Sequence, residues 1–181
     1  MSRVELVDPS AAHADVQPVL KEVQAAFGTT PAMFRAVANS PAALNMMWAG
    51  FGALGGGRLG PQIGEQIAVL VADRNACAYC LAAHTALGRN AGVSSEQMRE
   101  AQSGRSDDPK TEAILTFVEK VVRHRAQVSD ADIETLRAAG VDQGELVEVI
   151  ANVALNVFTN YINVALDVPV DFPAVPFTAQ G

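Results

Sequence analysis

The chain has 181 residues, of which 49% are hydrophobic, and a formal net charge of −7. This length fits one domain that can bury a full core without disulfide staples. The negative charge argues against a nucleic-acid partner, and no apolar run is long enough to cross a membrane. Residues 1–17 hold acidic residues and no apolar block, so we expect no signal peptide and a cytoplasmic location.

Helices joined by short loops are predicted along the whole chain, because apolar residues recur at helical spacing between capping residues, glycines and prolines. The absence of strand alternation and of a glycine-rich phosphate loop gives no support to a nucleotide-binding sheet or a thioredoxin fold. We therefore predict an all-α, multihelical single domain. The predicted helices span, in chain order, residues 15–27, 31–38, 41–55, about 61–72, 77–90, a short helix that begins at 94, 110–125, 130–139 and 143–166.

These helices define a body at residues 15–167, between an N-terminal extension (1–14) and a C-terminal tail (168–181). Three prolines in the tail predict an extended backbone there. A polar break is predicted at residues 73–76, between the fourth and fifth helices.

Cys77 and Cys80 are the only two cysteines of the chain, and His84 follows Cys80 by four residues. Residues three or four apart share one face of a helix, so the three side chains are expected along one stripe. Cys77 lies close to the predicted start of its helix, where the helix dipole favours a thiolate. The stripe therefore predicts a dithiol with an imidazole beside it.

Glu65 precedes Cys77 by twelve residues, and on one continuous helix it would lie about 18 Å away. The polar break at residues 73–76 is centred between Glu65 and His84. A chain reversal there would bring the two side chains to the same height on antiparallel helices. The carboxylate would then orient the imidazole and raise its basicity, and the imidazole would take a proton from Cys80.

Such a dithiol favours redox catalysis. A thiolate that attacks a peroxide O–O bond becomes a sulfenic acid, and a thiol nearby condenses with it to form a disulfide. The spacing is poor for a structural staple, because closing so small a loop removes little entropy from the unfolded chain. In the reducing cytosol, a close cysteine pair is expected to be catalytic or metal-binding.

The spacing Glu65-x11-Cys77-x2-Cys80-x3-His84 resembles the core motif of the AhpD-like alkylhydroperoxidases within the carboxymuconolactone decarboxylase family. The resemblance implies an AhpD-like helical fold with a catalytic helical hairpin, and a homotrimer or a hexamer built from trimers. Further matching positions are Leu59, Pro61, Leu81 and Gly92 around the motif, Phe27-Gly28-x-x-Pro31-x-x-Phe34 before it, and Asn156-x-Phe158-x-Asn160 after it.

Carried over residue by residue, the resemblance makes Cys80 the attacking thiol and Cys77 the resolving thiol, with Glu65 and His84 as the proton relay. The best-studied peroxidases of the family have histidine where this chain has Tyr79, so we expect a simpler relay and lower turnover. The decarboxylase members lack the cysteine pair, which makes lactone chemistry unexpected. The implied substrate is a small hydroperoxide, the reductant is an external dithiol or redox protein, and no bound cofactor or metal is required.

Other interpretations stay open. A disulfide reductase for a lipoyl-type or protein partner would use the same thiols, and the cysteines could also be ordinary buried residues. Two cysteines, a histidine and a glutamate could complete a zinc site, which would make the chain a non-catalytic helical module. Tyr79 and Trp48 are expected in packing, although both are candidates for the wall of the substrate pocket.

Asparagines at positions 152, 156, 160 and 163 place a polar stripe on the otherwise apolar last helix. We interpret this asparagine stripe as a buried hydrogen-bonding seam, within the chain or between subunits, rather than as a wall of the active site.

Overall fold

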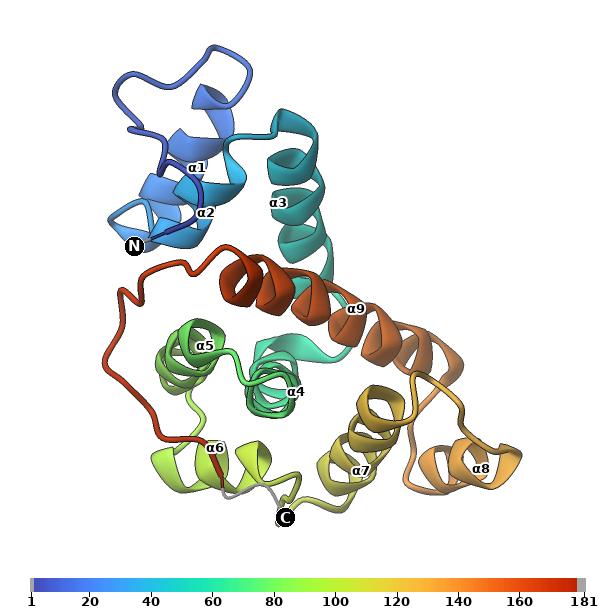
Figure 1. Ribbon diagram of the computed structural model, residues 1–181. Coiled ribbons are helices and arrows are strands. Elements are labelled where there is room, and N and C mark those ends of the chain that lie inside the picture. Colours follow the sequence, from blue (N-terminus) through green and yellow to red (C-terminus); the bar gives the residue numbers. More distant parts are fainter. Residues whose placement is uncertain (1, 179–181) are drawn as a thin grey trace.

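The computed structural model describes residues 2–178, and within this range nine α-helices and no β-strand are present (Figure 1). The predicted all-α class is therefore confirmed. The helices are α1 (Gln17–Phe27), α2 (Ala32–Val37), α3 (Pro41–Gly55), α4 (Gly60–Arg74), α5 (Ala78–Asn90), α6 (Ser95–Gln102), α7 (Pro109–Arg123), α8 (Asp130–Ala138) and α9 (Gln143–Ala165).

Local capping explains why the helix boundaries follow the sequence closely. Five N-cap side chains that carry a hydroxyl or a carboxylate accept a hydrogen bond from the backbone amide three residues later, which satisfies a donor that the helix leaves free. Proline in the first turn also begins α1, α3, α4 and α7. The five capping residues are Ser40, Ser94, Asp108, Ser129 and Asp142.

The α4–α5 hairpin lies at the centre of the molecule, and α4 packs against α5, α6, α7 and α9. The predicted break at residues 73–76 is too long, because Asp73 and Arg74 complete the last turn of α4. Both find partners on other helices: buried Gln102 donates to Asp73 at 2.7 Å, and Arg74 pairs with half-buried Glu119 at 2.7 Å. The reversal occurs instead at residues 75–77, where Ala76 adopts a left-handed backbone with φ of 51°.

Helix α9 packs against both α3 and α4, and in Figure 1 it crosses between α3 and the hairpin. Its inner face buries Val149, Val153 and three members of the asparagine stripe. Its outer face exposes apolar side chains that repeat every three or four residues, as in a coiled-coil seam. This outer stripe consists of Val147, Ile150, Ala154, Tyr161 and Val164, with half-buried Val157 completing the repeat. None of the helices in residues 2–178 combines the length and apolarity needed to cross a membrane.

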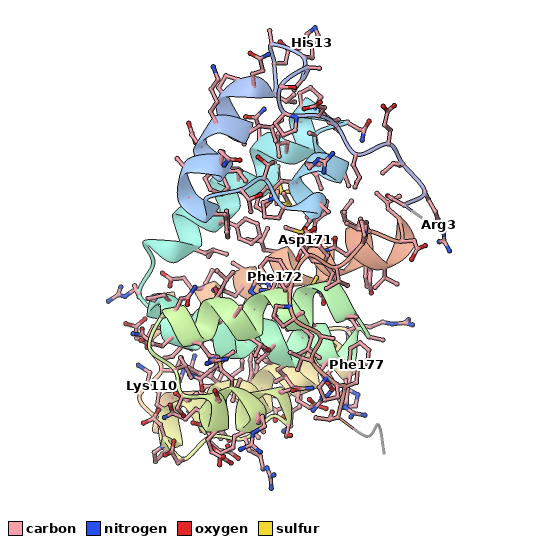
Figure 2. All side chains as sticks on the ribbon, turned by 90° about the vertical axis from the view of Figure 1, so that its left-hand side faces the viewer. Arg3, His13, Lys110, Asp171, Phe172 and Phe177 are labelled. Carbon is pink, nitrogen blue, oxygen red and sulfur yellow. The ribbon has the colours of Figure 1, made fainter. Side chains whose placement is uncertain are left out.

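The C-terminal tail is extended, as predicted, and hydrogen bonds hold it against the helices. After α9 it runs past α5 to α6, on the side of the molecule that faces the viewer in Figure 2. Asp171 accepts hydrogen bonds from the Ala32 amide at 2.5 Å and the Tyr79 hydroxyl at 2.9 Å. Further along, the backbone amide of Thr178 donates to Asp73 at 2.9 Å. Residues 179–181 of the predicted tail lie outside the described range.

The N-terminal extension also packs on the body. The Arg3 amide donates to the Leu166 carbonyl oxygen at 2.7 Å, and the Val7 amide donates to the Arg35 carbonyl oxygen at 3.2 Å. Ala12 is buried in the core. Both ends of the chain therefore contribute contacts to the helical body.

Candidate active site

Glu65 on α4 and His84 on α5 face each other across the hairpin. The Nδ1 atom of His84 lies 2.8 Å from Oε2 of Glu65, so the predicted contact between the two residues is present. Burial opposes a charge on His84, but the Glu65 carboxylate and the nearby Cys80 outweigh it and raise the pKa of the imidazole. The imidazole can therefore hold a proton near neutral pH.

Cys77 and Cys80 are both free thiols and almost fully buried, with exposed fractions of 0% and 2%. Cys77 does not lie within the helix as predicted. It is the N-cap residue of α5, with an extended backbone, and its Sγ accepts a hydrogen bond from the Cys80 amide at 3.2 Å. The turn at Ala76 places it there, so that its sulfur satisfies an amide of the first turn.

The two thiols differ strongly in acidity. A hydrogen bond from Cys77, together with the charge of His84 and the amides of Asn163 and Asn160, outweighs burial and lowers the pKa of Cys80 to about 7. The same hydrogen bond and burial raise the pKa of Cys77. The first-turn amides of Cys80 and Tyr79 do favour a thiolate at Cys77, as expected, but these two causes outweigh them, so Cys80 is the thiol that ionises near neutral pH.

A pocket of about 270 Å³ opens beside Cys80 and is lined also by Glu65 and His84. The sulfur of Cys80 and the carboxylate–imidazole pair thus share one cavity. The rest of its wall is mostly apolar and includes six aromatic side chains, among them the two that the sequence offered as wall candidates, Trp48 and Tyr79. The six are Phe27, Phe34, Trp48, Phe51, Tyr79 and Phe172.

Tyr79, which lies between the two cysteines in the sequence, is held through its hydroxyl and through its ring. Its hydroxyl donates to Asp171 at 2.9 Å and accepts from the Met33 amide at 3.3 Å, and its ring meets Phe172 edge-on, with centroids 5.8 Å apart. Burial raises the pKa of Tyr79. The phenol therefore stays neutral, in keeping with a wall residue that cannot serve as a base at neutral pH.

Phe172 is a pocket residue that the sequence interpretation missed. It belongs to the tail, and Figure 2 shows Asp171 and Phe172 where the tail passes between the N-terminal helices and the hairpin. The only indication in the sequence is an aromatic residue next to Pro173, and the sequence does not say which surface an extended tail covers.

Asn163 also reaches the site. Its Nδ2 atom donates a hydrogen bond to Cys80 Sγ at 3.2 Å. The interpretation of the asparagine stripe as a seam away from the active site is therefore wrong for this residue. The contact depends on how α9 is rotated against α5, and the periodicity of α9 alone does not give that rotation.

The zinc alternative finds no geometric support. Across residues 2–178, no group of three or more histidine, cysteine, aspartate or glutamate side chains is arranged to hold a metal ion. Glu65 is engaged by His84. A tetrahedral site on these residues is therefore not formed.

Residues 41–123 match the model of the carboxymuconolactone decarboxylase family, and this match includes Glu65, both cysteines and His84. Over these residues, the chain is similar to the carboxymuconolactone decarboxylase family. Among curated proteins, none matches it.

Solved structures extend the likeness of this chain to known proteins beyond residues 41–123. A peroxidase-related protein from Ralstonia eutropha JMP134, described as an alkylhydroperoxidase AhpD core, is 25% identical with a TM-score of 0.83, over 94% of this chain and 92% of that one. A peroxidase-related protein from Silicibacter sp. TM1040 is 24% identical with a TM-score of 0.82, over 93% and 91%. The AhpD-like fold therefore spans nearly the whole chain.

The same fold carries other chemistry. The debrominase Bmp8, solved with 2,3,4-tribromopyrrole, is 18% identical with a TM-score of 0.80, over 94% of both chains. At this identity the likeness concerns the fold alone.

Proposed function

We propose that this AhpD-like protein is a thiol-dependent peroxidase that reduces small organic hydroperoxides through Cys80 and Cys77. One observation carries the proposal: a thiol with a pKa near 7 shares an apolar pocket with a carboxylate–imidazole pair. A thiolate, an acid–base group and an apolar cavity are parts suited to the reduction of an organic hydroperoxide.

In the first step, the Cys80 thiolate attacks the terminal oxygen of the hydroperoxide. An S–O bond forms while the O–O bond breaks, and the sulfur loses two electrons. The leaving alkoxide takes a proton from His84 and departs as the alcohol. Glu65 binds Nδ1 of the imidazole, which leaves Nε2 to carry that proton.

In the second step, the sulfur of Cys77 attacks the sulfenic sulfur. An S–S bond forms, the S–O bond breaks, and the hydroxyl leaves as water with the proton of Cys77. An external dithiol or redox protein then returns two electrons and two protons. We place this cycle in the cytoplasm, whose thiol pools keep such pairs reduced.

A disulfide reductase for a protein partner is less favoured, because both sulfurs are buried. A halogenated aromatic compound is a second candidate substrate, since six aromatic side chains line the pocket and a structural neighbour is a debrominase. In that reaction the thiolate would remove the halogen from the ring, His84 would protonate the ring carbon, and Cys77 would displace the halide to form the same disulfide.

The deciding experiment counts thiols in fully reduced protein before and after one equivalent of cumene hydroperoxide. We expect the wild type to lose both thiols, and Cys77→Ser to accumulate a sulfenic acid that a dimedone probe traps. Cys80→Ser should keep its remaining thiol. A wild type whose thiols are unchanged after minutes would contradict the peroxidase, and halide release from a brominated pyrrole would then favour the second candidate.

We also propose that the chain self-associates through the outer stripe of α9, as a homotrimer or a hexamer built from trimers. The apolar side chains of the stripe repeat every three or four residues, so the stripe can pack against the same stripe of a second copy. A continuous row of exposed apolar side chains is also typical of subunit interfaces.

A further inference from the structure

We propose that Asn163 and Asn160 are catalytic residues that hold the sulfur of Cys80, first as a thiolate and then as a sulfenic acid. Neither asparagine lines the substrate pocket. Their amides would therefore support the sulfur while leaving the pocket to the hydroperoxide. The thiolate part stands by itself, and the sulfenic part rests on the proposed peroxidase function.

Asn163 makes the direct contact. Its Nδ2 atom donates to Cys80 Sγ at 3.2 Å, and the residue is 96% buried. A hydrogen bond to an ionised acceptor is stronger than one to a neutral acceptor, so this contact favours the thiolate over the thiol. The Oδ1 atom of Asn163 has no hydrogen-bond partner in the described residues. Burying an unpaired oxygen costs stability, and the chain nevertheless orients the amide toward the sulfur.

Asn160 lies one turn earlier on the same face of α9 and is completely buried. Its Oδ1 atom accepts a hydrogen bond at 2.9 Å from Asn75, the C-cap residue of α4. This contact fixes the orientation of the amide, so that Nδ2 remains as a buried donor without a hydrogen bond among the described residues. The amide of Asn160 nevertheless helps to lower the pKa of Cys80.

Oxidation supplies an acceptor for this free donor. When Cys80 attacks the hydroperoxide, the new S–O bond adds an oxygen to the sulfur, and Nδ2 of Asn160 is available to donate to it. The amides donate hydrogen bonds and give up no proton, so the alcohol still receives its proton from His84. The sulfenic sulfur would thereby be held in place until Cys77 attacks it.

The test of the thiolate part uses iodoacetamide instead of peroxide. The alkylation rate of Cys80 is measured against pH, with the modified peptide located by mass spectrometry. Asn163→Ala should raise the pKa of Cys80 by about one unit, which means about fivefold slower alkylation at pH 7, where about half of the wild-type thiol is ionised. Asn163→Asp, which keeps the shape but places a carboxylate near the sulfur, should raise the pKa further.

Thr159→Val is the matched control. Thr159 is equally buried on α9, and its hydroxyl donates to the Asn156 carbonyl oxygen at 3.0 Å, whereas no hydrogen bond joins it to either thiol in the described residues. This variant removes a buried hydrogen bond of the same helix, so its Cys80 pKa should stay at the wild-type value. An unchanged pKa in Asn163→Asp would overturn the proposal even if Asn163→Ala failed to fold.

The sulfenic part is tested in the Cys77→Ser background, where the sulfenic acid is not resolved. Asn160→Ala should shorten its lifetime several-fold after one equivalent of cumene hydroperoxide, as measured by delayed dimedone trapping. An equal lifetime would overturn this part. If the wild type does not react with peroxide at all, the peroxidase proposal fails, whereas the alkylation result still decides whether the asparagines hold the thiolate.

Discussion

The imidazole of His84 and the carboxylate of Glu65 are 2.8 Å apart, although nineteen residues separate them in the chain. The turn at residues 75–77 lies between them, and the antiparallel helices α4 and α5 bring the two side chains into contact. The pair lies in the wall of the pocket that contains Cys80. The proposed chemistry of this pair yields the first prediction.

Glu65→Gln should weaken the enzyme more at alkaline pH than at acidic pH. The carboxylate holds the pKa of His84 above its ordinary value, so a neutral amide lets the imidazole lose its proton at a lower pH. Less enzyme then carries the acid that the leaving alkoxide needs. We expect kcat/KM to fall by about 100-fold, with the alkaline limb of its pH profile moved to lower pH. A loss that is uniform between pH 5 and 9 would contradict the proton-relay role.

Phe172→Ala should change substrate preference. Phe172 closes one wall of the pocket, so its removal should raise KM for cumene hydroperoxide by about tenfold, the amount expected for one lost aromatic contact. KM for hydrogen peroxide, which is too small to fill the pocket, should change little. Phe177→Ala is the control, because Phe177 belongs to the same tail but lies 40% exposed and outside this pocket. Equal effects of both variants on both peroxides would exclude a selective role for Phe172.

Tyr79→Phe should reduce stability while preserving the acid–base profile. The variant leaves the Met33 amide and the Asp171 carboxylate without their shared hydroxyl, at a cost of about 1–3 kcal/mol. Urea denaturation measures that loss. Because the phenol stays neutral at working pH, the shape of the pH–rate profile should match the wild type. A shifted profile would mean that Tyr79 takes part in proton transfer.

The double variant Ile150→Glu and Tyr161→Glu should dissociate the proposed oligomer. Both positions lie in the outer stripe of α9, where burying two carboxylates against another copy would be strongly unfavourable. Light scattering after size-exclusion chromatography should give the 19.0 kDa monomer for the double variant and a multiple of that mass for the wild type. Phe177→Glu also places a carboxylate at an exposed apolar position, but it lies on the tail outside the outer stripe, so this variant should keep the wild-type mass. A monomeric wild type would contradict self-association.

Local signals in the sequence accounted for much of the fold. Helix starts follow from caps such as Ser40 and Asp142, and the Glu65–His84 contact follows from one turn placed between them. The polarity of Asp73 and Arg74 predicts a loop, but partners on α6 and α7 keep both residues helical. Local polarity carries no information about such partners.

The parts of the site that were missed depend on contacts between distant segments. The bond from Asn163 to Cys80 joins residues 83 positions apart, and that from Tyr79 to Asp171 joins residues 92 apart. Periodicity within one helix predicts which residues share a face, but it does not predict the neighbour against which that face packs. The lower pKa at Cys80 rather than at Cys77 follows in part from these distant contacts.

The near-complete burial of Cys77 and Cys80 has a consequence for electron delivery. A disulfide formed between them would lie in the wall of the aromatic pocket, out of reach of the flat face of a folded reductase. The electron donor would have to be narrow enough to enter the pocket, such as a small free dithiol or a dithiol at the end of a flexible arm. The shape of the donor, more than its reduction potential, would then limit how fast the protein turns over.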